Sequence, residues 1–117
     1  MSEHQLQCAV AQWLDLQGWL WCHPPMGGLR NKAVAAKLKA EGAKAGVPDI
    51  LIFEPFTVNV GLGSARYYHG IAIELKVGRN KPTESQQTWL DALARRGWST
   101  HVCRTVDEVI EVCRVIG

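Results

Sequence analysis

Residues 47–53, Val-Pro-Asp-Ile-Leu-Ile-Phe, and residues 70–77, Gly-Ile-Ala-Ile-Glu-Leu-Lys-Val, decide the fold. Each is an apolar run of strand length with ionisable residues at one end. Asp49 opens the first run, whereas Glu74 and Lys76 close the second. Because Glu74 and Lys76 are two residues apart in a predicted strand, their side chains point to one face. Charges on a buried strand are costly unless they are paired or bind a metal.

The segment between the two runs predicts how they meet. Glu54-Pro55 breaks the first strand, and residues 57–60 resume it. A hairpin loop at residues 61–65 then leads into one long strand over residues 66–77. The two key strands become antiparallel neighbours, which places Asp49 near Glu74 and Lys76.

Helical spacing and capping residues predict the remaining elements. The order α-β-(α)-β-β-α-β-α indicates an α/β fold, a mixed sheet with helices packed on its faces. The further elements are a helix over 3–17 ended by Gly18, a strand over 19–23, a helix over 31–41, a helix capped by Thr83 and ended by Gly97, a strand over 98–103, and a helix from Thr105 to Cys113.

Length and composition predict a single domain over residues 1–117, with 47% hydrophobic and 21% charged residues. No apolar run reaches the ~18 residues of a membrane span, and we see no signal-peptide pattern. The four cysteines have no C-x-x-C spacing, so we interpret them as free, mostly buried thiols of a cytoplasmic protein. A zinc site from Cys22, His23 and Cys103 is the weaker alternative, because paired ligands are missing.

Basic residues gather just before Asp49, although the net charge is only +2. Between Arg30 and Lys44 there are five basic residues and one acid, Glu41. A basic approach to a carboxylate site suits a phosphodiester substrate. A solvated helix bearing lysines explains the same run without any function, and the charges alone favour that interpretation.

The set of Asp49, Glu74 and Lys76 has two interpretations on physical grounds. One is a salt bridge between strand-end charges at a sheet edge. The other is a metal site, with the two carboxylates and the carbonyl of Leu75 as ligands and Lys76 orienting a water. Mg²⁺ fits such a site, because it takes a few carboxylate oxygens and keeps water for the rest.

The motifs together resemble the VRR-NUC (virus-type replication-repair nuclease) branch of the PD-(D/E)-x-K superfamily. The resemblance covers most of the chain, from Glu3 to Cys113. The matching pieces are Glu3-x-x-Leu6-Gln7, His23-x-Pro25-x-Gly27-Gly28-x-Arg30, Gly42-x-x-x-Gly46-Val47-Pro48-Asp49-Ile50, Ile73-Glu74-Leu75-Lys76, Gln86-x-x-Trp89-Leu90 and Gly97.

This resemblance implies a restriction-endonuclease-like core, α-β-β-β-α-β-α, and a catalytic centre that uses Mg²⁺, with Mn²⁺ as a substitute. Asp49, Glu74 and Lys76 would form the centre. Glu3 would complete the metal shell, although spacing alone favours a first-turn acid that suits the helix dipole. Gln86 would lie over the site and also serve as a capping-box partner. Phosphate contacts would come from His23, Arg30 and Lys44, while His23 could equally be a plain strand-end residue.

The resemblance also implies a setting and a substrate. Small members of the family are similar to phage and bacterial proteins, and some resemble Holliday-junction resolvases that act as homodimers on branched DNA. Trp19, Trp21 and Trp98 are candidates for an apolar interface, although core packing is the commoner use of tryptophan. Neither a membrane nor a nucleotide cofactor is expected. Met26 stands where relatives often have Asn, a departure that argues against a polar contact at this position. The competing functions are a non-catalytic DNA-binding or assembly module and a sequence-specific restriction-type nuclease.

Overall fold

A four-stranded mixed sheet forms the centre of the computed structural model, which describes residues 1–25 and 31–117. Strands β1, β2 and β5 pair antiparallel, and β6 pairs parallel to β5. The strand order across the sheet is β1-β2-β5-β6, with β1 at Trp21–Cys22, β2 at Ile50–Ile52, β5 at Ile71–Leu75 and β6 at Ser99–Cys103. The predicted mixed sheet flanked by helices is confirmed.

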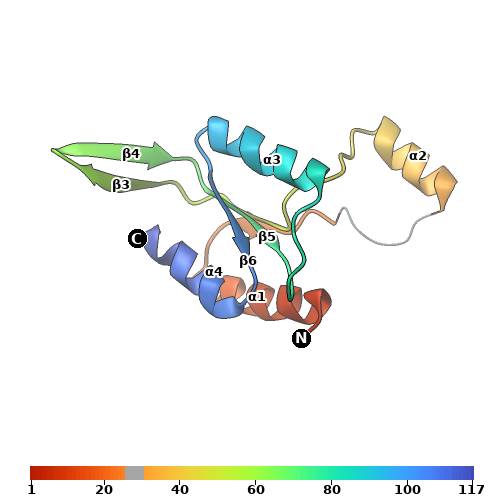
Figure 1. Cartoon of the computed structure of the whole chain (residues 1–117), viewed down its shortest axis with the longest axis horizontal. Helices are drawn as coiled ribbons and strands as arrows, with labels where there is room; N and C mark the ends of the chain where they lie inside the picture. The colour runs from red at the N-terminus through yellow and green to blue at the C-terminus, as the bar shows by residue number, and fades with distance from the viewer. Residues whose placement is uncertain (26–30) are drawn as a thin grey trace.

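Helices cover both faces of this sheet (Figure 1). Helix α3 (Glu84–Arg95) lies on one face, and α1 (Glu3–Gln17) and α4 (Val106–Val112) lie on the other. Alternation along β5 sends every second side chain toward α1 and α4. The buried core there contains Leu6, Val10, Leu14, Ile50, Ile52, Ile71, Ile73, Leu75, Cys103, Val109 and Cys113.

The first key strand is shorter than the sequence predicted, because β2 starts only at Ile50. Its antiparallel pairing with β5 is as predicted, with Ile50 opposite Ile73. Pro48 has no backbone N–H to donate to a strand neighbour. At the next residue, the amide of Leu75 donates to the side chain of Asp49 and not to a backbone carbonyl of the first strand. Strand β1 is likewise reduced to two residues, and Pro24-Pro25 follows it closely.

The prediction of one strand over residues 66–77 is wrong. The chain forms β4 (Ser64–Tyr68), breaks at His69-Gly70 and then forms β5. Gly70 passes so close to β2 that an added Cβ would lie 2.2 Å from the carbonyl oxygen of Ile52. Strand β4 therefore leaves the main sheet and pairs with β3 (Phe56–Gly61) as a separate hairpin that projects from the body (Figure 1). The predicted hairpin is present, with a tighter turn at Leu62-Gly63.

Helix α2 (Lys32–Ala40) forms where predicted, yet it buries none of its residues. The Asn31 side chain caps it through the amide of Val34, and Gly42 follows its end at φ 102°. It stands apart from the sheet, beyond α3 (Figure 1). The apolar side chains whose spacing predicted this helix therefore do not face the core.

The other three helices begin at the predicted caps. Ser2 with Gln5 and Thr83 with Gln86 form complete capping boxes. Thr105 accepts a hydrogen bond from the amide of Glu108 at the start of α4. A short 3₁₀ turn over Cys113–Val115 continues α4.

Two of the four cysteines, Cys103 and Cys113, are buried, whereas Cys8 and Cys22 are exposed. The prediction of mostly buried thiols is thus correct for half of them. Among residues 1–25 and 31–117, no group of three His, Cys, Asp or Glu side chains could hold a metal, so the zinc alternative has no support. Trp13 and Trp19 pack edge to face beside the core, which favours the packing use of tryptophan. None of the described helices has the length and apolarity to cross a membrane.

Candidate active site

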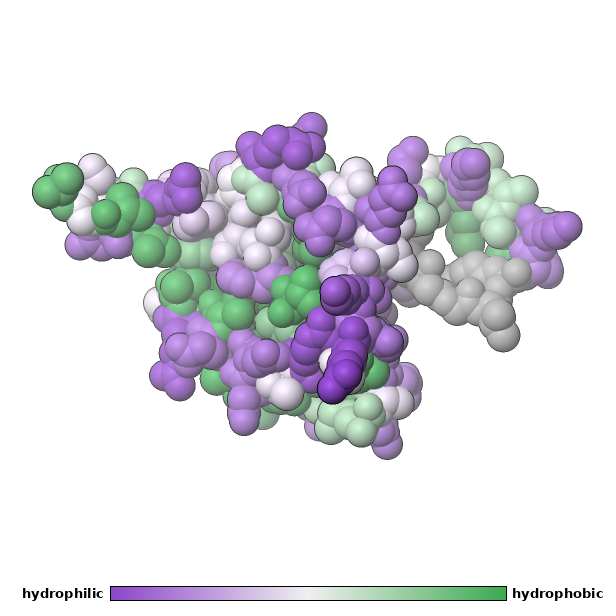
Figure 2. Space-filling view, in the orientation of Figure 1, coloured by the Kyte–Doolittle hydropathy of each residue, from purple (hydrophilic) through white to green (hydrophobic). Residues whose placement is uncertain are grey.

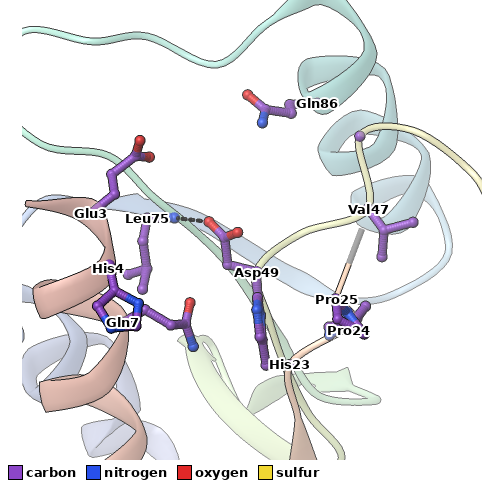
Figure 3. Close-up of a pocket in the computed structure, with 11 residues that line it drawn as sticks. Glu3, His4, Gln7, His23, Pro24, Pro25, Val47, Asp49, Leu75 and Gln86 are labelled. Atoms are coloured by element: carbon purple, nitrogen blue, oxygen red, sulfur yellow. Dashed lines mark hydrogen bonds between the residues drawn. The ribbon is translucent and has the colours of Figure 1, made fainter. Parts of the chain in front are cut away.

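Five segments meet at one end of the sheet around a cavity of about 560 Å³ (Figure 3). They are the first turns of α1 and α3, the segment after β1, the loop before β2, and the end of β5. The lining residues are Glu3, His4, Gln7, His23, Pro24, Pro25, Gly46, Val47, Asp49, Leu75 and Gln86. The cavity therefore collects residues from both helical layers at the point where β2 begins and β5 ends.

Asp49 is held from two sides at the centre of this cavity (Figure 3). Its Oδ2 accepts the amide of Leu75 at 2.7 Å. Its backbone carbonyl accepts a hydrogen bond from Nδ1 of His23 at 2.6 Å. Because a carbonyl only accepts, His23 must carry its proton on Nδ1. These two bonds fix both the backbone and the carboxylate of Asp49.

Glu74 and Lys76 are buried charged residues on the next strand, with exposures of 2% and 8%. They lie on the β5 face opposite to that of Ile73 and Leu75, as the two-residue spacing predicted. Burial is the largest of the causes that together raise the pKa of Glu74 to about 9. Asp49 contributes to this rise through a hydrogen bond and through its charge, and Lys76 opposes it. The structure thus brings Asp49, Glu74 and Lys76 together.

Glu74 also has an oxygen without a partner. Its Oε2 is buried and makes no hydrogen bond within the described part of the chain. A buried, unsatisfied carboxylate oxygen beside a second carboxylate is costly. A hard cation would remove both costs, because it provides a partner for the oxygen and neutralises the repulsion. The residues present therefore fit a divalent cation with oxygen ligands.

The backbone of Leu75 adds a third oxygen at this edge. In a strand, the N–H and C=O of one residue point to the same edge. The amide of Leu75 points to Asp49, so its carbonyl points to the same edge, beyond the start of β2. Two carboxylates and one carbonyl leave further positions for water, as Mg²⁺ prefers. The described residues contain no group of three His, Cys, Asp or Glu side chains that could hold a metal, so the Leu75 carbonyl would be needed as a ligand.

Glu3 and Gln86 face the cavity from opposite helical layers (Figure 3). Glu3 is exposed in the first turn of α1. Its negative charge also raises the pKa of Glu74, and this is the smallest of the contributions to the shift. Gln86 accepts the Thr83 amide through Oε1 at 2.8 Å. Its side-chain NH₂ makes no hydrogen bond within the described residues, so Gln86 caps α3 and still offers a donor to the cavity.

The three predicted phosphate contacts have different outcomes. His23 lines the cavity, but its Nδ1 proton is used on Asp49. Lys44 is exposed in the loop between α2 and β2 and is not brought to the cavity wall. Arg30 and Met26 lie outside the described residues.

Sequence reasoning missed His4, which lines the cavity beside Glu3, and gave no role to Gln7, Val47 or Pro24. His4 lies 3.6 Å from the sulfur of Cys8, measured from its Nε2. The available signal was its spacing of three residues from Gln7, a residue of the family motif, because residues i and i+3 lie on one face of a helix. Val47 and Pro24 supply only shape, for which a single sequence contains no chemical signal.

The chain is similar to known proteins in both fold and sequence. No curated protein matches the sequence. A solved structure described as a VRR_NUC domain protein matches with a TM-score of 0.73 and 29% identity, over 99% of this chain and 88% of that chain. The model of the VRR-NUC domain matches residues 1–107, which include Asp49, Glu74 and Lys76. The chain therefore belongs to the VRR-NUC family, a member of the PD-(D/E)-x-K superfamily of nucleases.

Proposed function

We propose that this protein is a Mg²⁺-dependent endonuclease that hydrolyses phosphodiester bonds in branched DNA, with four-way junctions as the main substrate, and that it acts as a homodimer. Mn²⁺ is expected to replace Mg²⁺. One observation supports the metal site above all others: Oε2 of Glu74 is buried without a partner next to Asp49. Membership of a nuclease family supports the reaction type.

Asp49, Glu74, the carbonyl of Leu75 and, directly or through water, Glu3 would hold the cation. When bound, such a cation supplies Lewis-acid stabilisation of the charge that develops on the attacked phosphate. Asp49 is kept in place by Leu75 and His23, so its carboxylate needs no rearrangement to bind.

Lys76 has the other central role in this proposal. Its ammonium is buried beside Glu74, where it lowers the pKa of that carboxyl group. An ammonium so placed orients the attacking water and stabilises negative charge on the phosphate oxygens. Gln86 lines the cavity, and its free NH₂ would donate to a phosphate oxygen.

DNA reaches the cavity past a basic segment. In the sequence, Arg30, the lysines of α2 and Lys44 all come shortly before Asp49. A phosphate contact from His23 would use Nε2, because Nδ1 already donates to Asp49. A helix of nine residues that buries none of them is marginal alone in water. Contact with a polyanion would stabilise α2 and use its lysines.

The branched substrate and the dimer follow from symmetry. A four-way junction needs two cuts to be resolved, and a two-fold dimer presents two equivalent sites. One copy of 117 residues is also small for a substrate with four duplex arms.

Substitution of Lys76 tests the catalytic role. We expect Lys76→Ala to abolish Mg²⁺-dependent cleavage of a labelled four-way junction, while DNA affinity stays within a few-fold. Lys81→Ala removes the same charge from an exposed loop and serves as the control that still cleaves. Full activity of Lys76→Ala would remove the proposed role of this lysine.

The choice of substrate separates the competing functions. The wild-type protein is incubated with four-way, flap and linear duplex DNA in Mg²⁺, Mn²⁺ or EDTA. Preferred cutting of branched DNA with metal supports the proposal. Binding without cutting of any substrate would favour a non-catalytic module, and cutting of linear duplex at one sequence would favour a restriction-type nuclease.

A further inference from the structure

A second cavity, of about 480 Å³, lies at the other end of α3 from the candidate active site. Strand β4 forms one side, and the end of α3 with the start of β6 forms the other. We call it the arginine groove, lined by Arg66, Tyr67, Tyr68, Ala94, Arg95, Gly97, Trp98, Ser99, Thr100 and His101. It shares no residue with the first cavity.

The charge of the arginine groove is positive and is not neutralised. Arg66 comes from β4 and Arg95 from the last residue of α3. Within the described residues, the single ion pair joins Arg114 to Glu111, so neither arginine has a carboxylate partner. No acidic residue lines the groove. Two arginines from separate elements therefore line a space that holds no counter-charge from the described residues.

His101 adds no further charge. Burial lowers its pKa, and its Nε2 lies 2.7 Å from Oγ of Ser99. A simpler role exists for Arg95, because a cation in the last turn of a helix suits the helix dipole. That role does not explain Arg66, which lies on a strand of the separate hairpin and faces the same groove.

The other lining groups suit a phosphodiester ligand. Guanidinium forks match the geometry of phosphate oxygens. Thr100 and Tyr67 line the same space. The Tyr67 ring packs edge to face with His69, and Tyr67 still has 56% of its surface exposed for contact with a sugar or base. An acidic peptide would use the arginines but would have no need of these neighbours.

Both cavities lie within reach of one DNA strand. Gln86 and Arg95 are nine residues apart on α3, which is about 14 Å along the helix axis at ~1.5 Å per residue. Phosphates of one strand advance by about 3.4 Å each, so this distance corresponds to roughly four nucleotides. A strand cut at the first cavity therefore extends far enough to meet the groove.

We infer that the arginine groove is a second DNA-binding site that takes the phosphate backbone of the substrate about four nucleotides from the cleaved bond. This inference rests on the proposed nuclease function. It assigns to Arg66 and Arg95 a binding role that is separate from the chemistry at Asp49, Glu74 and Lys76.

The test measures DNA binding without cleavage. Affinity for a fluorescent four-way junction is measured by anisotropy in EDTA, over a range of salt concentrations. We expect Arg66→Ala/Arg95→Ala to lose about tenfold in affinity and to reduce the salt slope by about 1.8, the release expected for two phosphate contacts. Cleavage at subsaturating DNA in Mg²⁺ should fall in proportion to the lost affinity.

Two further variants control this experiment. Arg96→Ala removes a neighbouring charge whose guanidinium bonds the carbonyl of Ala92 and does not line the groove. We expect it to keep most of the affinity and slope, and Arg66→Lys/Arg95→Lys to restore part of both. If the double alanine variant keeps wild-type affinity and salt slope and still cleaves, the proposed role of the arginine groove is wrong and the proposed nuclease function stands. Absence of DNA binding by the wild-type protein would overturn both the groove and the proposed function.

Discussion

Glu74 is a side chain whose protonation depends on what fills the cavity beside it. Without a cation, burial and Asp49 raise its pKa to about 9, so the carboxyl group is protonated at neutral pH. In the unfolded chain the same group ionises near its ordinary value of 4.5. The folded protein then binds more protons than the unfolded chain between these two values, so the free energy of unfolding falls as pH rises through this range.

This linkage predicts a pH-dependent effect of Glu74→Gln. In EDTA, the variant should gain thermal stability relative to wild type as pH rises from 5 to 8, by on the order of 1–3 kcal/mol. The melting temperatures of the variant and of wild type are compared at each pH. Their difference removes the contribution of the titrating groups that both proteins share. Mg²⁺ should raise the melting temperature of wild type and have little effect on the variant. A constant difference across this pH range would contradict the burial of Glu74.

The sequence identified the residues of the candidate site better than their surroundings. Asp49, Glu74 and Lys76 stand out because charge on an apolar strand is unusual, and pairing of the two runs brings them together. Their roles in catalysis stay predictions. The bond from His23 to the carbonyl of Asp49 was unpredictable, since it depends on where β1 ends against β2.

At the scale of elements, the loop before β2 is tied to the start of α3. Gly46 has φ +90°, and a Cβ added there would lie 2.5 Å from the carbonyl oxygen of Ser85. This close approach places Asp49 below Gln86 in the cavity (Figure 3). The glycine of the Gly-Val-Pro-Asp motif thus sets the distance between a loop and a helix.

Gly46→Ala should therefore destabilise the protein by on the order of 1–3 kcal/mol and reduce cleavage. Gly42→Ala is the matched control, because it has φ +102° but nothing within 4 Å of an added Cβ. Gly42→Ala therefore has the free-energy cost of a positive φ but no steric clash. Urea denaturation of both variants and of wild type measures the difference. Equal losses for the two glycines would show that the contact with Ser85 has no role.

Helix boundaries followed from the sequence because their signals are local. Ser2, Thr83 and Thr105 each cap the helix that they were predicted to cap. The break between β4 and β5 could not be predicted, because it results from packing of Gly70 against Ile52 and Trp98, which are distant in sequence. Apolar alternation alone cannot distinguish one long strand from two strands that belong to different sheets.

The whole molecule is elongated, 54 Å by 30 Å by 29 Å, because the hairpin and α2 project from opposite ends of the sheet (Figure 1). A globular shape would have been the default expectation from composition. The mixed sheet between helical layers was predictable from the order of elements, whereas these two projections were not, since neither contributes much to the core.

The proposed dimer predicts the mass of the particle in solution. Sedimentation velocity should give twice the 13.0 kDa of one chain, and native mass spectrometry should find two chains on one four-way junction. Both strands of a junction should then be cut within one binding event. A single chain that resolves the junction at every concentration would contradict this arrangement.

The hairpin turn has a consequence for anyone who purifies the protein. Leu62 sits at φ 53° with its side chain fully in solvent, at the apolar tip that Figure 2 shows at the left of the molecule. Leucine is poorly suited to that backbone conformation, which asparagine adopts readily. Leu62→Asn would relieve the backbone strain and remove an exposed apolar side chain, far from the cavity that contains Asp49. The variant should aggregate less and be easier to crystallise.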